Sequence, residues 1–115
     1  MKQGSCILGG IIVVIGMLTG ATAAESGAST KGKSIYEQHC LACHGGSGKG
    51  DGPVGTVLNP KATDFSSSAF KQKPDSELLP LIEDGIKGTA MASWKGTLSE
   101  EDRREVLAYI RALNR

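Results

Sequence analysis

Aromatic residues and cysteine are scarce in this 115-residue sequence, which contains one Trp, two Tyr, two Phe and three Cys. The net charge is also small, because the sequence has 13 basic and 12 acidic side chains. Nucleic-acid binding favours a strongly basic face, so this balance argues against that function. No internal repeat is present. A domain cut from so short a chain has only a marginal apolar core of its own.

One long apolar run is present, from Ile7 to Leu18, with a basic residue before it and small residues after it. These features are typical of a secretory signal peptide, which we place at residues 1–24. Cleavage after Ala23 and cleavage after Ala24 fit equally well. The run is shorter than the roughly 20 residues that span a membrane comfortably. An uncleaved membrane anchor is the alternative interpretation.

The rest of the chain is interpreted as one small domain. Residues 25–30 are small and polar, which is typical of a flexible linker. Residues 31–115 then form the folded part. The leader holds one basic residue and no acidic one, so its removal leaves the basic and acidic side chains in balance.

The most specific motif is the run Cys40-Leu41-Ala42-Cys43-His44. The spacing C-x-x-C-H is the attachment signature of c-type haem. Two thiols three positions apart lie on one side of a helical turn, so each can add to one haem vinyl group. His44 can then give an imidazole nitrogen to the iron. We expect one covalently attached haem c per chain, which would also supply an apolar centre for the fold.

Two other uses of these cysteines are less favoured. A thioredoxin-type redox disulfide requires a βαβ context, and no strand-like alternation precedes Cys40. A structural zinc site requires a fourth ligand, usually from a second Cys/His pair. The remaining candidates are His39, directly beside Cys40, and Cys6, which lies in the leader.

The domain is predicted to be all-α, with helices separated by glycine-rich loops. Helices are expected at about residues 31–39, 64–70 and 76–84, and a last helix follows Ser99. The glycine-rich segment 45–53 is predicted to be a loop, because so many glycines favour neither helix nor strand.

The ends of the last two helices also carry signals. Asp75 or Ser76 is expected to cap the helix at 76–84, whose start Pro80 should distort, and Gly85 should end it. Ser99 and Asp102 resemble a capping box at the start of the last helix. The core-facing stripe of that helix is predicted to consist of Val106, Tyr109, Ile110 and Leu113.

A sixth iron ligand can be predicted by elimination. Haem c carriers use a second His or a Met, or leave the position open. His39 is adjacent to Cys40 and cannot easily reach the opposite face of the haem. Two of the three methionines lie in the leader, so Met91 is the remaining candidate, in the irregular segment 85–94. We therefore expect Met91 to bind the iron.

Together these features resemble class I cytochrome c, in its small bacterial single-haem form, over essentially the whole region after the leader. The resemblance implies N- and C-terminal helices that cross nearly at right angles around the covalently bound haem. Gly32 and Tyr36, eight and four residues before Cys40, match the first helix of that crossing. Val106 and Tyr109 match the second.

The resemblance also implies roles for three further residues. A proline carbonyl after the motif accepts the proton of the second imidazole nitrogen of His44, which fixes the ring. Pro53 is expected in this role, with Pro60 as a rival. Trp94 is expected at the haem, where it either hydrogen-bonds a propionate or packs on the ring edge.

The implied function is transfer of single electrons rather than catalysis, because an iron bound by His44 and Met91 has no position open for substrate. The expected partners are a redox donor and a redox acceptor that bind transiently, in the periplasm. Membrane contact is expected only through partner complexes or an uncleaved leader that anchors the protein facing the periplasm. The rival functions are a haem enzyme or gas sensor with an open sixth site, and a fixed subunit of a membrane or dehydrogenase complex.

Overall fold

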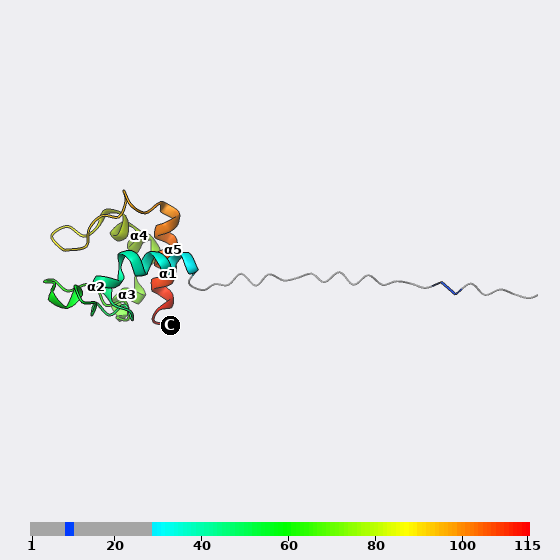
Figure 1. Ribbon diagram of the computed structural model, residues 1–115, viewed down its shortest axis with the longest axis horizontal. Helices are drawn as coiled ribbons and strands as arrows, with labels where there is room; N and C mark the ends of the chain where they lie inside the picture. Colours follow the sequence, from blue (N-terminus) through cyan, green and yellow to red (C-terminus); the bar gives the residue numbers. More distant parts are fainter. Residues whose placement is uncertain (1–8, 11–28) are drawn as a thin grey trace, which may run out of the picture.

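The computed structural model describes residues 9–10 and 29–115 (Figure 1). The predicted leader, apart from residues 9–10, and residues 25–28 of the predicted linker lie outside the described residues. The described part contains helices and no strand, which confirms the all-α prediction. Its elements are α1 (Thr30–His39), α2 (Leu41–His44), the 3-10 turn η1 (Gly55–Val57), α3 (Ser68–Gln72), α4 (Asp75–Asp84) and α5 (Glu100–Ala112). No helix among these is both long enough and apolar enough to cross a membrane.

Helix α1 begins one residue earlier than the sequence predicted. Ser29 is its N-cap, and the Ser29 hydroxyl accepts a hydrogen bond from the Gly32 amide at 2.9 Å. Such a cap satisfies an amide that would otherwise have no partner in the first turn. Ser29 and Thr30, placed in the linker by the sequence, therefore belong to the folded domain.

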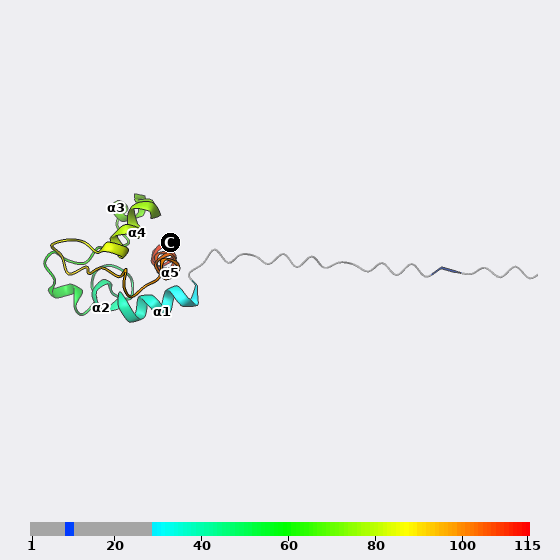
Figure 2. The ribbon, with the colours of Figure 1, turned by 90° about the horizontal axis from the view of Figure 1, so that it is seen from above.

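Helices α1 and α5 cross in contact with each other, as predicted. Figure 2 shows α5 almost end-on while α1 runs across the view. At the contact, a Cβ added to Gly32 would overlap the backbone carbonyl of Glu105, so only glycine permits this approach. The Tyr36 and Tyr109 rings lie 5.2 Å apart between centroids, and the side chains of Tyr36 and Val106 are fully buried.

Helix α5 is closed at its start by the predicted capping box. The Ser99 hydroxyl accepts a hydrogen bond from the Asp102 amide, and the Asp102 carboxylate accepts one from the Ser99 amide, both at 3.1 Å. This arrangement fixes the first turn. The buried face of the helix consists of Arg103, Val106, Leu107 and Ile110.

Helix α4 differs from its prediction at the start. It begins at Asp75 after the N-cap residue Pro74, so Asp75 and Ser76, the expected caps, both lie inside the helix. Pro80 occupies the middle of the helix and has no amide hydrogen to donate, yet the helix is unbroken from residue 75 to 84. Gly85 ends it with a φ of 72°, as predicted.

Helix α3 starts four residues later than expected. The Asp64 carboxylate accepts hydrogen bonds from the Ser66 amide at 2.8 Å and from the Ser66 hydroxyl at 2.6 Å. This local turn competes with a helical start at Asp64. Ser67 then caps the helix by accepting a hydrogen bond from the Phe70 amide.

The glycine-rich segment after α2 is a loop, as predicted, and it lies against residues 62–65. A Cβ added to Gly50 would overlap the Ala62 carbonyl, and Gly50 also has a positive φ of 75°. The Phe65 amide donates to the Gly48 carbonyl at 2.7 Å. This close approach brings residues 62–65 next to α2.

Candidate functional site

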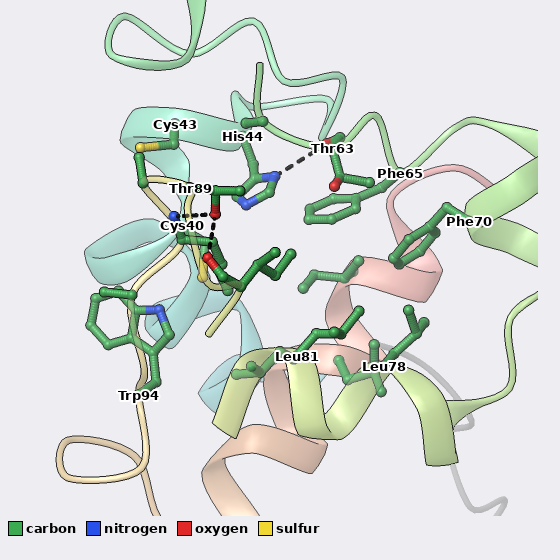
Figure 3. A pocket seen from close by; sticks show the side chains of 18 of the residues that line it. Cys40, Cys43, His44, Thr63, Phe65, Phe70, Leu78, Leu81, Thr89 and Trp94 are labelled. Carbon is green, nitrogen blue, oxygen red and sulfur yellow. Dashed lines mark hydrogen bonds between the residues drawn. The ribbon is translucent and has the colours of Figure 1, made fainter. Parts of the chain in front are cut away.

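A cavity of ≈ 460 Å³ lies between α2, α4, residues 58–70 and the segment that joins α4 to α5 (Figure 3). This volume is within the range of about 300–1,000 Å³ that cofactor pockets occupy. Five of the six residues predicted for the site line it, namely Cys40, Cys43, His44, Met91 and Trp94. Its inner wall is apolar, and Figure 3 shows Phe65, Phe70, Leu78 and Leu81 there.

The two cysteines reach the cavity from one helical turn. Cys40 is the residue between α1 and α2, and its carbonyl accepts hydrogen bonds from the amides of Cys43 at 3.2 Å and His44 at 2.9 Å. Both thiols are free and half-buried. Burial, and to a lesser degree the neighbouring Cys43, raises the pKa of Cys40 to about 11.

A raised thiol pKa disfavours the redox-disulfide alternative. Reactive cysteines of that kind have lowered pKa values, because the thiolate is the nucleophile. The described part of the chain contains no group of three or more His, Cys, Asp or Glu side chains that could hold a metal ion. Thioether attachment of a haem to Cys40 and Cys43 stays a prediction.

His44 is oriented by two neighbours. Its Nδ1 lies 3.2 Å from the Thr63 carbonyl oxygen (Figure 3). A carbonyl can only accept, so Nδ1 carries the proton and Nε2 keeps its lone pair. The Phe65 ring stacks on the imidazole with centroids 4.4 Å apart and planes 17° apart. Burial lowers the pKa of His44, partly offset by the bond to Thr63, which favours the neutral ring that binds a metal.

The prediction that a proline carbonyl accepts the proton of the His44 imidazole is wrong. The acceptor opposite His44 belongs to Thr63, not to Pro53 or to its rival Pro60. The Pro53 carbonyl instead accepts a hydrogen bond from the Thr56 hydroxyl at 3.1 Å, and Pro53 does not line the cavity, whereas Pro60 does.

The reason lies in where the loop after the motif runs. The Val54 amide donates to the Ala42 carbonyl at 2.9 Å, and the Gly52 amide donates to the Cys43 carbonyl at 3.2 Å. Residues 52–54 are thus held by the backbone of α2, away from the His44 ring. The chain reaches that ring only at residue 63.

Met91 reaches the cavity from a turn that closes on itself. The Ile86 amide donates to the Met91 carbonyl at 2.9 Å. The Thr89 hydroxyl donates to the Ile86 carbonyl at 2.7 Å and accepts from the Met91 amide at 3.1 Å (Figure 3). The half-buried Met91 and His44 therefore line the same cavity, as a pair of haem ligands requires. Ligation by Met91 stays a prediction.

Trp94 lies at the edge of the cavity that carries the cysteines. Its ring centroid is 5.0 Å from that of His39, the residue before Cys40. Figure 3 likewise shows Trp94 on the side of Cys40 and away from Phe70. Vinyl groups and propionates occupy opposite edges of the haem. Which of the two expected roles Trp94 has at the haem stays a prediction.

Sequence reasoning missed two residues that orient His44. Thr63 contributes a backbone carbonyl, which any residue type could supply, so no side-chain signal marked it. Phe65 lies within the segment expected to form a helix at about residues 64–70, and nothing in the sequence linked it to His44. The one available signal was the small number of phenylalanines, because the sequence has two. Both of them line the cavity.

Comparison with known proteins adds independent information. The model of the protein family described as cytochrome c oxidase, cbb3-type, subunit III, matches residues 27–110. The cytochrome c6 of Chlorolobion braunii is 33% identical over 79 residues, and that of Tetradesmus obliquus is 32% identical over 79 residues. Each alignment covers 69% of this chain and 83% of the relative.

Two longer proteins are matched only in part. The cbb3-type cytochrome c oxidase subunit FixP of Bradyrhizobium diazoefficiens is 29% identical over 85 residues, which are 74% of this chain and 27% of that subunit. A chain of the reducing HAO-like protein complex of Kuenenia stuttgartiensis has a TM-score of 0.68 at 25% identity, over 76% of this chain and 43% of that one. The chain thus spans less than half of either protein.

Proposed function

The chain belongs to the cytochrome c family, and on this premise we propose that it carries single electrons between redox proteins through one covalently attached haem c. The observation that carries the proposal is the convergence of four groups on one cavity. These are the thiols of Cys40 and Cys43, the imidazole of His44 and the thioether of Met91.

Each group has a separate task in this proposal. Cys40 and Cys43 would hold the porphyrin by thioether bonds, and Nε2 of His44 and the sulfur of Met91 would bind the iron. Bound haem supplies reversible exchange of one electron between ferric and ferrous iron. The soft thioether favours the ferrous state, and the two protein ligands leave no position for a substrate, so carriage of electrons is favoured over catalysis.

We place the protein in the periplasm, where it meets its donor and acceptor transiently. The leader-like pattern at residues 1–24 and the haem-attachment motif support export. Trp94 and His39 lie at the cysteine edge of the cavity and are half-buried, so this edge reaches the surface. Electrons are proposed to enter and leave there.

A second candidate is a fixed electron-transferring subunit of a terminal oxidase. It is favoured by the match to the cbb3-type subunit family and by the likeness to FixP. Recovery of the protein from membranes together with oxidase subunits would support this candidate. Recovery as a free protein from the periplasmic fraction would support the shuttle.

The test is the behaviour of the purified holoprotein towards carbon monoxide. We expect no binding of carbon monoxide by the reduced protein at neutral pH, because Met91 occupies the sixth position. We also expect the oxidised protein to show the weak long-wavelength band of sulfur-bound ferric haem. Rapid binding of carbon monoxide, or absence of the band, would instead favour the haem enzyme or gas sensor.

A further inference from the structure

Arg103 is the charged residue on the buried face of α5, and it is only 7% exposed. It lies in register with Val106, Leu107 and Ile110, where an apolar side chain would be expected. A buried arginine is retained where its charge and its donors are paired. The elements that provide those partners indicate what the residue does.

The guanidinium of Arg103 joins α5 to two other parts of the chain. Nη1 donates to the Leu98 carbonyl at 2.6 Å, and Nη2 donates to the Glu83 carboxylate at 3.2 Å. The other oxygen of Glu83 pairs with Lys95 at 3.2 Å. The planar guanidinium carries its donors on separate nitrogens in a rigid fork, whereas a lysine ammonium carries its donors on one compact nitrogen.

Glu83, which accepts a hydrogen bond from Arg103, also binds the segment after Met91. The Glu83 carbonyl accepts hydrogen bonds from the Ser93 hydroxyl at 2.6 Å and from the Lys95 amide at 3.1 Å. One residue earlier, the Ile82 carbonyl accepts from the Trp94 amide at 3.1 Å. The last turn of α4 therefore anchors residues 93–95, and Arg103 anchors that turn.

We infer that Arg103 is a positioning residue for Met91, an inference that rests on the proposed function. Met91 lies two residues before Ser93, and residues 93–98 are fixed on one side by α4 and on the other by Arg103. Without the guanidinium, the Leu98 carbonyl loses a buried donor and the Glu83 carboxylate loses its buried cation. The segment then opens more often, and the thioether of Met91 is held less firmly in the cavity.

The test compares two arginines of the same helix in the holoprotein. Arg103→Ala removes the bridge to residues 83–98. Arg111→Ala is the matched control, because Arg111 bridges α5 to another segment, with its Nε 3.0 Å from the Asp75 carboxylate and a further bond to the Lys73 carbonyl. Both changes remove contacts of the fold, but only the first touches the segment of Met91.

Two readouts separate positioning from general stability. In Arg103→Ala we expect the sulfur-to-iron band to weaken and the Trp94 and Lys95 amides to exchange about tenfold faster, the scale of one lost hydrogen bond. Arg111→Ala should keep the band and the amide protection even if its melting temperature falls as far. Arg103→Lys, which can restore one bond, should lie between Arg103→Ala and the wild type, and it serves if the alanine variant does not fold.

An unchanged band and unchanged exchange in Arg103→Ala would overturn the inference, as would equal loss of the band in Arg111→Ala. A wild-type protein without the band would instead contradict ligation by Met91, and with it the proposed function. Amide exchange at Trp94 and Lys95 would then still report whether Arg103 holds the segment.

Discussion

At the scale of single residues, the orientation of His44 depends on two groups that are not expected to bind the haem iron. The Thr63 carbonyl fixes the proton on Nδ1, and the Phe65 ring covers one face of the imidazole. Both belong to a segment that reaches His44 because Gly50 lets it approach the loop. The backbone of this segment therefore orients Nε2, the nitrogen proposed to bind the iron, as much as side chains do.

Substitution of Gly50 tests this dependence. In Gly50→Ala the new methyl group overlaps the Ala62 carbonyl and the residue must keep a positive φ, so residues 62–63 must shift. We predict a stability loss of about 1–3 kcal/mol and loss of the hydrogen bond between Thr63 and His44. Thermal unfolding and the NMR signal of the Nδ1 proton measure the two effects.

Gly46→Ala is the matched control for this prediction. Nothing lies within 4 Å of a Cβ added to Gly46, and its φ is not positive. It should melt as the wild type does and keep the proton signal. Equal melting temperatures for the two alanine variants would contradict the role assigned to Gly50.

The sequence predicted four residues that the structure places at one cavity, and their roles toward haem stay predictions. Spacing singled out Cys40, Cys43 and His44, and elimination singled out Met91, because thiols, imidazole and thioether are rare and specific groups. The prediction of Pro53 was wrong because the acceptor of the His44 hydrogen bond is a backbone carbonyl, that of Thr63. The position of that carbonyl depends on the length of the loop between the motif and the segment that contacts His44. Residue types do not encode that length.

At the scale of elements, the crossing of α1 and α5 joins the two ends of the described domain. Gly32→Val inserts a branched side chain where the helix backbones touch. We predict a clear fall in melting temperature with haem still attached, since overpacking costs about 1–3 kcal/mol. Gly96→Val is the control, because a Cβ added at Gly96 meets nothing within 4 Å. A melting temperature of Gly32→Val at or above that of the control would show that close packing of α1 on α5 at Gly32 does not stabilise the fold.

The same pair of helices is joined at the surface by charge. Lys31 lies 2.9 Å from carboxylate oxygens of both Glu101 and Asp102. The bond to Lys31, together with those from Ser99, lowers the pKa of Asp102 from 3.8 to about 2. A lowered pKa in the folded state adds stability above the unfolded value, and that stability is lost as the pH falls through the folded value.

We therefore predict a pH-dependent effect of Lys31→Gln. The variant should melt slightly below the wild type at neutral pH, and the difference should shrink as the pH falls from 3.8 to about 2. Lys33→Gln is the control, because the ion pair of Lys33 lies within α1, with Glu37 at 3.8 Å. A difference between Lys31→Gln and wild type that stays constant over this range would show that the Asp102 charge is not involved.

Helix interiors and one cap were predictable, whereas the starts of α1, α3 and α4 were not. Ser99 and Asp102 stand at capping-box spacing, and the structure forms both bonds. The start of α3 was misplaced because the Asp64 side chain forms its own turn with Ser66. The start of α4 was misplaced because Pro74 precedes the helix without a side-chain cap. Competing local hydrogen bonds decide such ends, and periodicity does not report them.

At the scale of the whole molecule, the core and the cavity share their walls. Six of the buried core residues also line the cavity, namely Phe65, Phe70, Leu78, Val106, Leu107 and Ile110. An occupant of this cavity thus completes the apolar core and stabilises the folded state. The fold class was accessible from the sequence, but this sharing of walls was not, because it depends on how distant segments pack.

Covalent attachment should be visible in the whole protein. We predict that haem stays with the polypeptide after acid–acetone extraction, and that Cys40→Ala with Cys43→Ala releases it. The double variant should also melt at a lower temperature, because a dissociable group stabilises the fold only in proportion to its occupancy. Haem that is extracted from the wild type would contradict thioether attachment.

The central proposal is that the protein carries electrons through one haem iron that is bound by His44 and Met91. A redox titration of the holoprotein against its Met91→Ala variant tests it most directly. We predict a folded variant with a lower reduction potential and no sulfur-to-iron band, because the ligand that favours ferrous iron is lost. A variant with the potential and the spectrum of the wild type would contradict the claim.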